Sequence, residues 1–309
     1  MYAEIGIWSI YAASGVNAVT IPLINIVCTY MATELTEYEN RRTDSDFEDA
    51  LIMKLFVFYF VNSYASFFYI GFIAPYAPNP PGSPPGTLGD CMYSNCMIPL
   101  GINLVIIYGS RLCSDYFINI VIPYALYQWN RSKATAQVKF DSLTRPEMEY
   151  LQQDYTSSDM SIYNCLAVII EFGYTFMFIA AAPGAAFFAV ILNLLELKGL
   201  AWKILEFHQR PVPEEDADIG VWTNIFILIA GMSVITNSAL ITTLTSSGLA
   251  EGGFWYFTIL QWVGFVAMFI IIKAIPDETG DVTIQRLRSE FLETKIVNKL
   301  MDHMRYSHC

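Results

Sequence analysis

Seven long apolar stretches divide this chain of 309 residues, and each is long enough to cross a lipid bilayer as a helix. A bilayer core of about 30 Å requires about 20 largely apolar residues in one helical segment. Hydrophobic residues make up 54% of the chain, which agrees with a lipid environment. We therefore predict an all-α integral membrane protein with about seven transmembrane helices. The predicted spans are residues 7–31, 50–73, 97–127, 162–182, 185–207, 221–245 and 254–275.

The basic residues occupy every second gap between these stretches. All but one of the 17 Lys and Arg residues lie in or beside such a gap or follow the last stretch, and the exception is Arg111 inside the third stretch. The intervening gaps, residues 74–96, 181–184 and 246–253, contain no basic residue. Because cytoplasmic loops collect Lys and Arg, the N-terminus is predicted outside and the C-terminus in the cytoplasm. This orientation requires an odd number of spans.

After the last stretch, apolar residues recur at near-helical spacing among charged ones, which predicts an amphipathic cytoplasmic helix. They are Ile284, Leu287, Phe291, Ile296 and Leu300. The chain is therefore predicted to have a transmembrane domain over residues 1–280 and a cytoplasmic C-terminal helix over residues 281–309.

Composition and motifs exclude several classes of function. A net charge of −12 argues against nucleic acid as a partner. The sequence contains no P-loop, GxSxG, HExxH or Ser-His-Asp pattern, and its three histidines are too isolated to suggest a zinc site. We therefore do not predict an enzyme.

The third predicted span carries a polar face. Ionisable residues inside a membrane are costly and mark functional sites. Arg111 and Asp115 lie four residues apart, so a structural ion pair is one explanation for both. A stripe that also includes Ser110, Ser114 and Asn119 better fits a helix that lines a hydrated path.

Oxygen-bearing side chains on three predicted spans suggest a degenerate metal site. Asp115, Asn119, Asn164 and Glu196 all lie toward the cytoplasmic half of their spans, at similar depth. Calcium takes six to eight oxygen ligands, usually including several carboxylates. This set holds two carboxylates, so it is an incomplete calcium shell.

Two cysteines differ from the others in their surroundings. Cys91 and Cys96 lie in the Pro-rich loop that the orientation places outside, where the environment is oxidising if the protein faces the exterior or a secretory lumen. The alternatives are a local disulfide and two free thiols.

A series of short strings follows along nearly the whole chain in a fixed order. They are Glu39–Thr43 (ENRRT), Phe60–Tyr64 (FVNSY), Ile169–Gly173 (IIEFG), Asn193–Lys203 (NLLELKGLAWK), and Arg210–Pro213 (RPVP) followed by Asp218, Ile219, Gly220 and Trp222. In this order the strings resemble the anoctamin family, whose members act as calcium-activated chloride channels or phospholipid scramblases. The RPVP string with its DIGxW continuation is the most specific of them.

The resemblance implies that the chain corresponds to the family's fourth to tenth spans, without the cytoplasmic N-terminal domain and the first three spans. Family members are typically homodimers, and each subunit has a membrane-facing groove lined by its third to seventh spans. The chain is therefore expected to lack one wall of this groove. Membrane lipids and chloride or other small ions are the partners that the resemblance implies. It does not distinguish the plasma membrane from an endomembrane.

The resemblance also implies a calcium site and a hinge. The family binds calcium through an Asn and a Glu on its sixth span, two Glu on the seventh, and a Glu and an Asp on the eighth. The matching residues here are Asp115 and Asn119, then Asn164 and Ala167, then Glu196 and Leu200. Because ligand charge is reduced, calcium is expected to bind weakly or not at all. Gly109 matches the family's hinge glycine on the sixth span.

These inferences lead to one principal expectation and one alternative. The principal expectation is passive transport by an anion channel, a phospholipid scramblase or both, along Ser110, Arg111, Ser114, Asp115 and Asn119, with calcium dependence weakened or lost. The alternative is a non-transporting scaffold or tether with the same fold, or an inactive fragment of a longer protein.

Overall fold

The computed structural model describes residues 2–79, 89–91, 95–137, 144, 149–150, 152, 157–210, 219–244, 253–275 and 280–307. The side chains of Asp115 and Asn119 lie outside this description, although their backbone lies within it. The chain forms two compact units, Met1–Ile259 and Leu260–Cys309.

Helices make up the regular structure of both units. The first unit contains α1 (Tyr2–Glu39), α2 (Asp44–Phe68), α3 (Met97–Tyr116), α4 (Ile122–Gln137), α6 (Ser157–Met177), α7 (Ala185–Glu206) and α8 (Val221–Leu244). The unit boundary falls within α9 (Gly253–Ala274), and α10 (Gly280–Ser307) lies in the second unit. In the described part of the chain, six helices are long and apolar enough to cross a membrane. The predicted all-α integral membrane protein is therefore confirmed.

The fourth predicted span is shorter than expected from its sequence. Its apolar helical part covers Ser161–Met177, whereas the prediction extended to residue 182. The chain turns after Met177, and in this turn the backbone N–H of Ala180 donates to the Asn237 side chain of α8 at 3.0 Å. A hydrogen bond thus joins the turn after α6 to α8.

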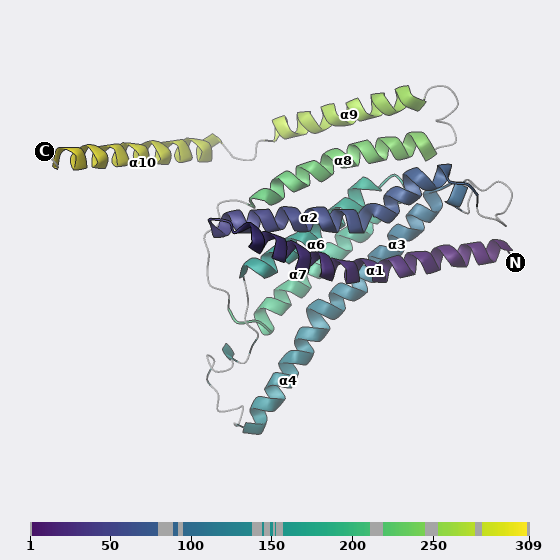
Figure 1. Ribbon diagram of the computed structural model, residues 1–309, viewed down its shortest axis with the longest axis horizontal. Coiled ribbons are helices and arrows are strands. Elements are labelled where there is room, and N and C mark those ends of the chain that lie inside the picture. The colour runs from purple at the N-terminus through teal and green to yellow at the C-terminus, as the bar shows by residue number, and fades with distance from the viewer. Residues whose placement is uncertain are drawn as a thin grey trace. The chain divides into compact units, whose positions relative to one another are not determined.

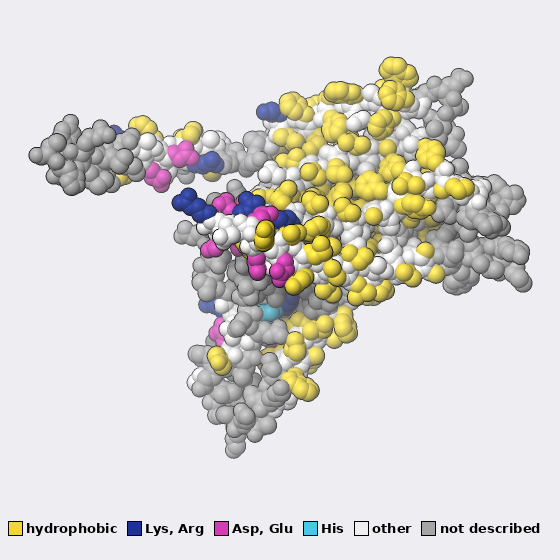
Figure 2. All heavy atoms as spheres, in the orientation of Figure 1, with side chains coloured by type: hydrophobic (Ala, Val, Ile, Leu, Met, Phe, Trp, Pro, Cys, Tyr) yellow, Lys and Arg dark blue, Asp and Glu magenta, His cyan; other side chains and the backbone are white. Residues whose placement is uncertain are grey.

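A left-handed residue ends α1 at the position of the ENRRT string. Asn40 has a φ of 47°, a conformation that Asn tolerates and that terminates helices. Thr43 then caps α2 by accepting a hydrogen bond from the Asp46 backbone N–H at 3.1 Å. Across this turn, Lys54 Nζ lies 2.8 Å from a Glu39 carboxylate oxygen. Figure 2 shows charged side chains gathered around this turn, while hydrophobic side chains cover the sides of the neighbouring helices.

Polar side chains join α1 to α2 along their length. Asn17 Nδ2 donates to Ser66 Oγ at 2.7 Å, and Asn62 Nδ2 donates to Asn25 Oδ1 at 2.7 Å. Farther along, the hydroxyls of Thr29 and Tyr59 lie 2.9 Å apart. Because lipid tails are as apolar as the helices, such hydrogen bonds and close packing hold membrane helices together.

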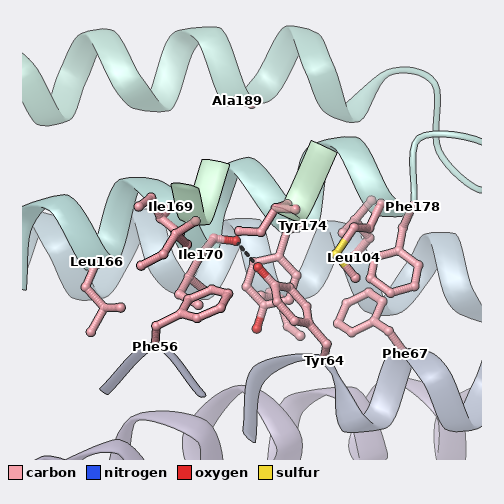
Figure 3. Packing of buried hydrophobic residues seen from close by; sticks show 14 of the residues in the cluster. Phe56, Tyr64, Phe67, Leu104, Leu166, Ile169, Ile170, Tyr174, Phe178 and Ala189 are labelled. Carbon is pink, nitrogen blue, oxygen red and sulfur yellow. Dashed lines mark hydrogen bonds between the residues drawn. The ribbon is translucent and has the colours of Figure 1, made fainter. Parts of the chain in front are cut away.

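The helix α6 occupies the centre of the first unit. It packs against α2, α7 and α8, while α1 packs against α2 and α3 (Figure 1). Figure 3 shows the aromatic residues of α2, Phe56, Tyr64 and Phe67, directed toward α6. The third predicted span is helical throughout. It consists of α3, a π-helical segment at Phe117–Val121 and the beginning of α4, which follow one another without a break. π-helical segments of this kind are frequent at functional sites.

Candidate functional site

Arg111 lies on α3 and binds the backbone of α6. Its Nη2 donates to the carbonyl oxygen of Ala167 at 3.1 Å, and the side chain is partly buried. Leu104, Ile107 and Tyr108 on the preceding turns are buried, so Arg111 continues the face of α3 that packs into the unit. A guanidinium cannot lose its charge under ordinary conditions. The contact therefore places a permanent positive charge between two membrane helices.

Beside this region, two tyrosines join α2 and α6 through hydrogen bonds. Tyr64 Oη donates to the carbonyl oxygen of Ile170 at 2.7 Å, drawn as the dashed line in Figure 3. In the opposite direction, Tyr174 Oη donates to the carbonyl oxygen of Ser63 at 3.1 Å. Both rings are fully buried and pack edge to face, with centroids 4.9 Å apart. These reciprocal bonds fix the position of α2 along the axis of α6.

A buried acid lies one helical turn after Ala167. Glu171 is 3% exposed, and its backbone oxygen accepts a hydrogen bond from Thr175 Oγ1 at 3.0 Å. The Thr175 hydroxyl also binds the hydroxyl of Tyr108 on α3. The interface between α3 and α6 thus contains a carboxyl group, a guanidinium and several hydroxyls in one short stretch.

The structure describes some of the side chains of the predicted polar stripe on α3. Ser110 Oγ donates to the Ile107 carbonyl of its own helix at 2.9 Å, and Ser114 is partly buried. Gly109 has open space where a side chain would lie. Asp115 lies in α3 and Asn119 in the π-helical segment, but their side chains lie outside the described residues. Among the side chains of the stripe that the structure describes, that of Arg111 binds another helix.

Two of the four predicted calcium ligands share one cavity. Asn164 on α6 and Glu196 on α7 line a cavity of about 430 Å³, which Leu200 also lines. Glu196 further borders a smaller cavity of about 240 Å³ between α3 and α7. The structure thus places Asn164 of α6 and Glu196 of α7 on the same cavity.

The donor set of this cavity fits calcium poorly. Among the residues that the structure describes, no group of three or more His, Cys, Asp or Glu side chains is arranged to hold a metal. The cavity offers one carboxylate and two amides, those of Asn164 and Asn193. Calcium favours six to eight oxygens with several carboxylates.

The loop before α3 contains a disulfide. Cys91 and Cys96 are bonded, with their Cα atoms 5.3 Å apart, and both are buried. Cys96 directly precedes α3, so the bond anchors the beginning of the helix that carries Arg111.

The sequence did not single out the tyrosine and threonine hydroxyls of this region. Tyr64, Tyr108 and Tyr174 lie in apolar runs, where a tyrosine is expected to be an ordinary core residue. Their partners are on other helices, so no local spacing could have revealed the pairs.

Comparison with known families agrees with the short strings found in the sequence. The profile of one family, described as "Anoctamin: Calcium-activated chloride channel", matches residues 2–289. The chain belongs to the anoctamin family. This confirms the predicted resemblance, which also ran along nearly the whole chain.

Individual anoctamins are similar at about the same level. Anoctamin-3 of Mus musculus is 31% identical over 244 residues, covering 76% of this chain and 24% of that protein. Anoctamin-4 of Homo sapiens is 31% identical over 241 residues, covering 75% and 25% respectively. Anoctamin-5 of Homo sapiens is 29% identical over 312 residues, covering 96% and 34%. The chain thus spans about a quarter to a third of the length of these anoctamins.

Proposed function

We propose that this chain forms a passive anoctamin-type transport pathway for small anions, phospholipids or both. The observation that carries the proposal is Arg111, whose guanidinium is held between α3 and α6 within the membrane. A charge inside the bilayer is tolerated where it faces a bundle interior or water, and it marks ion or substrate pathways. A fixed positive charge on such a path favours anions electrostatically.

Two buried oxygens near this interface support a hydrated path. Ser63 Oγ on α2 and Asn103 Oδ1 on α3 are buried and have no hydrogen-bond partner among the described residues. A polar atom in a membrane core costs several kcal/mol if nothing satisfies it. Entry of water from the α3 face would satisfy both oxygens and hydrate the path beside Arg111.

Calcium dependence is proposed to be weak or lost. Ala167 and Leu200 hold two positions at which the resemblance implies carboxylates, and neither can bind a cation through its side chain. The α6 carbonyl at Ala167 instead accepts a hydrogen bond from Arg111. Transport through this chain should therefore proceed without calcium.

A non-transporting scaffold is the second candidate. It is favoured by the direct packing of α1 against α3 and by the hydrogen bonds that tie α1 to α2. A bundle in which α1 covers α2 and α3 would keep the fold and the expected homodimer but would have no conducting path.

Reconstitution of the purified protein in liposomes separates the two candidates. Chloride efflux and exchange of a labelled phospholipid are measured for the wild type and for Arg111→Ala. Loss of the guanidinium should lower chloride efflux about tenfold, equivalent to about 1.4 kcal/mol of anion stabilisation. The control is Arg288→Ala on the exposed face of α10, which should transport like the wild type. Background efflux and exchange in all three proteins would favour the scaffold.

A further inference from the structure

The larger cavity beside Glu196 has one polar side and one apolar side. It lies between α6, α7 and the beginning of α8, with a volume of about 430 Å³. Asn164, Asn193 and Glu196 supply its polar groups. Leu200, Trp222 and Phe226 are among the residues of the apolar side. Pockets of a few hundred Å³ with a few convergent polar groups are typical of small-molecule sites.

The polar side of the cavity is rich in hydrogen-bond acceptors. The amide nitrogen of Asn193 donates to the Ala189 carbonyl of its own helix at 2.9 Å. Its Oδ1 remains as an acceptor. Within the described part of the chain, the partly buried Asn164 amide makes no hydrogen bond. Glu196 adds a carboxylate. An unsatisfied amide inside a membrane span is costly, which points to a polar ligand on this side.

The apolar side argues against a bare metal ion as that ligand. Trp222 is 7% exposed and presents an aromatic surface to the cavity together with Phe226. A dehydrated divalent ion would gain one carboxylate and two amides there, while an organic cation would also bury its hydrocarbon. Aromatic faces further stabilise an ammonium group.

We propose that this cavity binds a primary ammonium group carried on a hydrocarbon chain. A primary ammonium has three N–H donors, which matches the three acceptors supplied by Asn164, Asn193 and Glu196. The hydrocarbon would lie against Leu200, Trp222 and Phe226. This binding site does not depend on transport along α3.

The location of the cavity suggests two sources for such a group. Trp222 is in the first turn of α8, and Glu196 lies about three turns before the end of α7, on the side predicted to be cytoplasmic. In the sequence, four acidic residues within 214–218 directly precede this end of α8. The ammonium could therefore belong to an aminophospholipid of the inner leaflet or to a soluble alkylamine. Both share the same chemistry.

A direct test measures binding of n-hexylammonium chloride to the purified protein in phosphatidylcholine nanodiscs. Calorimetric titration is corrected with empty discs, and n-hexanol serves as the uncharged counterpart. We expect saturable binding of hexylammonium and none of hexanol. Hexyltrimethylammonium, which has no N–H donor, should bind about tenfold more weakly.

Variants locate the binding to this cavity. Glu196→Gln keeps the shape but removes the charge, and it should weaken hexylammonium binding at least about tenfold. The matched control is Glu206→Gln, exposed on the same helix and outside the cavity, which should bind like the wild type. Asn164→Leu should weaken binding roughly threefold to tenfold through loss of one acceptor, and it remains informative if Glu196→Gln does not fold.

Discs containing phosphatidylethanolamine distinguish the two sources. Weakened hexylammonium binding in these discs identifies the lipid headgroup as the ligand, and unchanged binding identifies a soluble amine. The proposal is overturned if hexylammonium fails to saturate in the phosphatidylcholine discs, or if wild type and Glu196→Gln bind it equally there.

Discussion

At the scale of single residues, one glycine allows the central tyrosine pair to form. A side-chain carbon at Gly173 would overlap the Tyr64 hydroxyl and lie 2.7 Å from the Tyr64 ring. Gly173 therefore leaves room for the ring whose hydroxyl binds the Ile170 carbonyl. Its place in the IIEFG string thus has a physical reason in packing.

Gly173→Ala is expected to destabilise the fold by about 1–3 kcal/mol, because neither backbone nor ring has space to yield. The measurement is the free energy of unfolding in detergent micelles. Gly15→Ala is the matched control, since a side chain there meets nothing within 4 Å. Equal stability of the two variants would show that α2 and α6 do not pack this closely.

The importance of Arg111 was predictable from the sequence, but the neighbour that its side chain faces was not. The sequence marked Arg111 as the one basic residue that loops do not explain. Whether it faces lipid, a groove or another helix depends on the rotation of α3 against α6, which has no signature in local spacing. The hydrogen bond to Ala167 shows that it faces α6.

At the scale of elements, the helices follow from hydropathy, whereas some of their ends do not. The beginnings of the predicted spans at residues 97, 185, 221 and 254 agree with α3, α7, α8 and α9 within one residue. The predicted fourth span runs past the end of α6 into a turn, where Asn237 of α8 accepts from the Ala180 N–H and donates to the Phe176 carbonyl at 2.6 Å. The end of α1 was also missed, because the polar residues after Met31 continue the helix to Glu39.

Asn237→Leu is expected to lower the free energy of unfolding by about 1–3 kcal/mol, since two hydrogen bonds between segments are lost inside the membrane. Ser238→Ala is the neighbouring control, because the Ser238 hydroxyl donates to the Val234 carbonyl of its own helix at 2.7 Å. Chemical denaturation in detergent measures both. If Asn237→Leu were as stable as Ser238→Ala, the two hydrogen bonds of Asn237 would not contribute to the stability of the fold.

At the scale of the whole molecule, the family of the chain is described as calcium-activated, whereas the cavity beside Glu196 has few calcium ligands. The chain matches the calcium-activated channel family over residues 2–289. Its cavity beside Glu196, however, combines one carboxylate with amides and apolar side chains, and Arg111 binds α6 at Ala167. The sequence predicted this loss of carboxylates, but it could not show that an apolar cavity adjoins the remaining one.

The most direct test of this account measures chloride efflux and phospholipid exchange in the same liposomes, with micromolar calcium and with a calcium chelator. Weak calcium binding predicts that both rates stay within about twofold between the two conditions and above those of protein-free liposomes. Activation by calcium of tenfold or more would contradict the account, because the described donor set would then be sufficient to bind the ion.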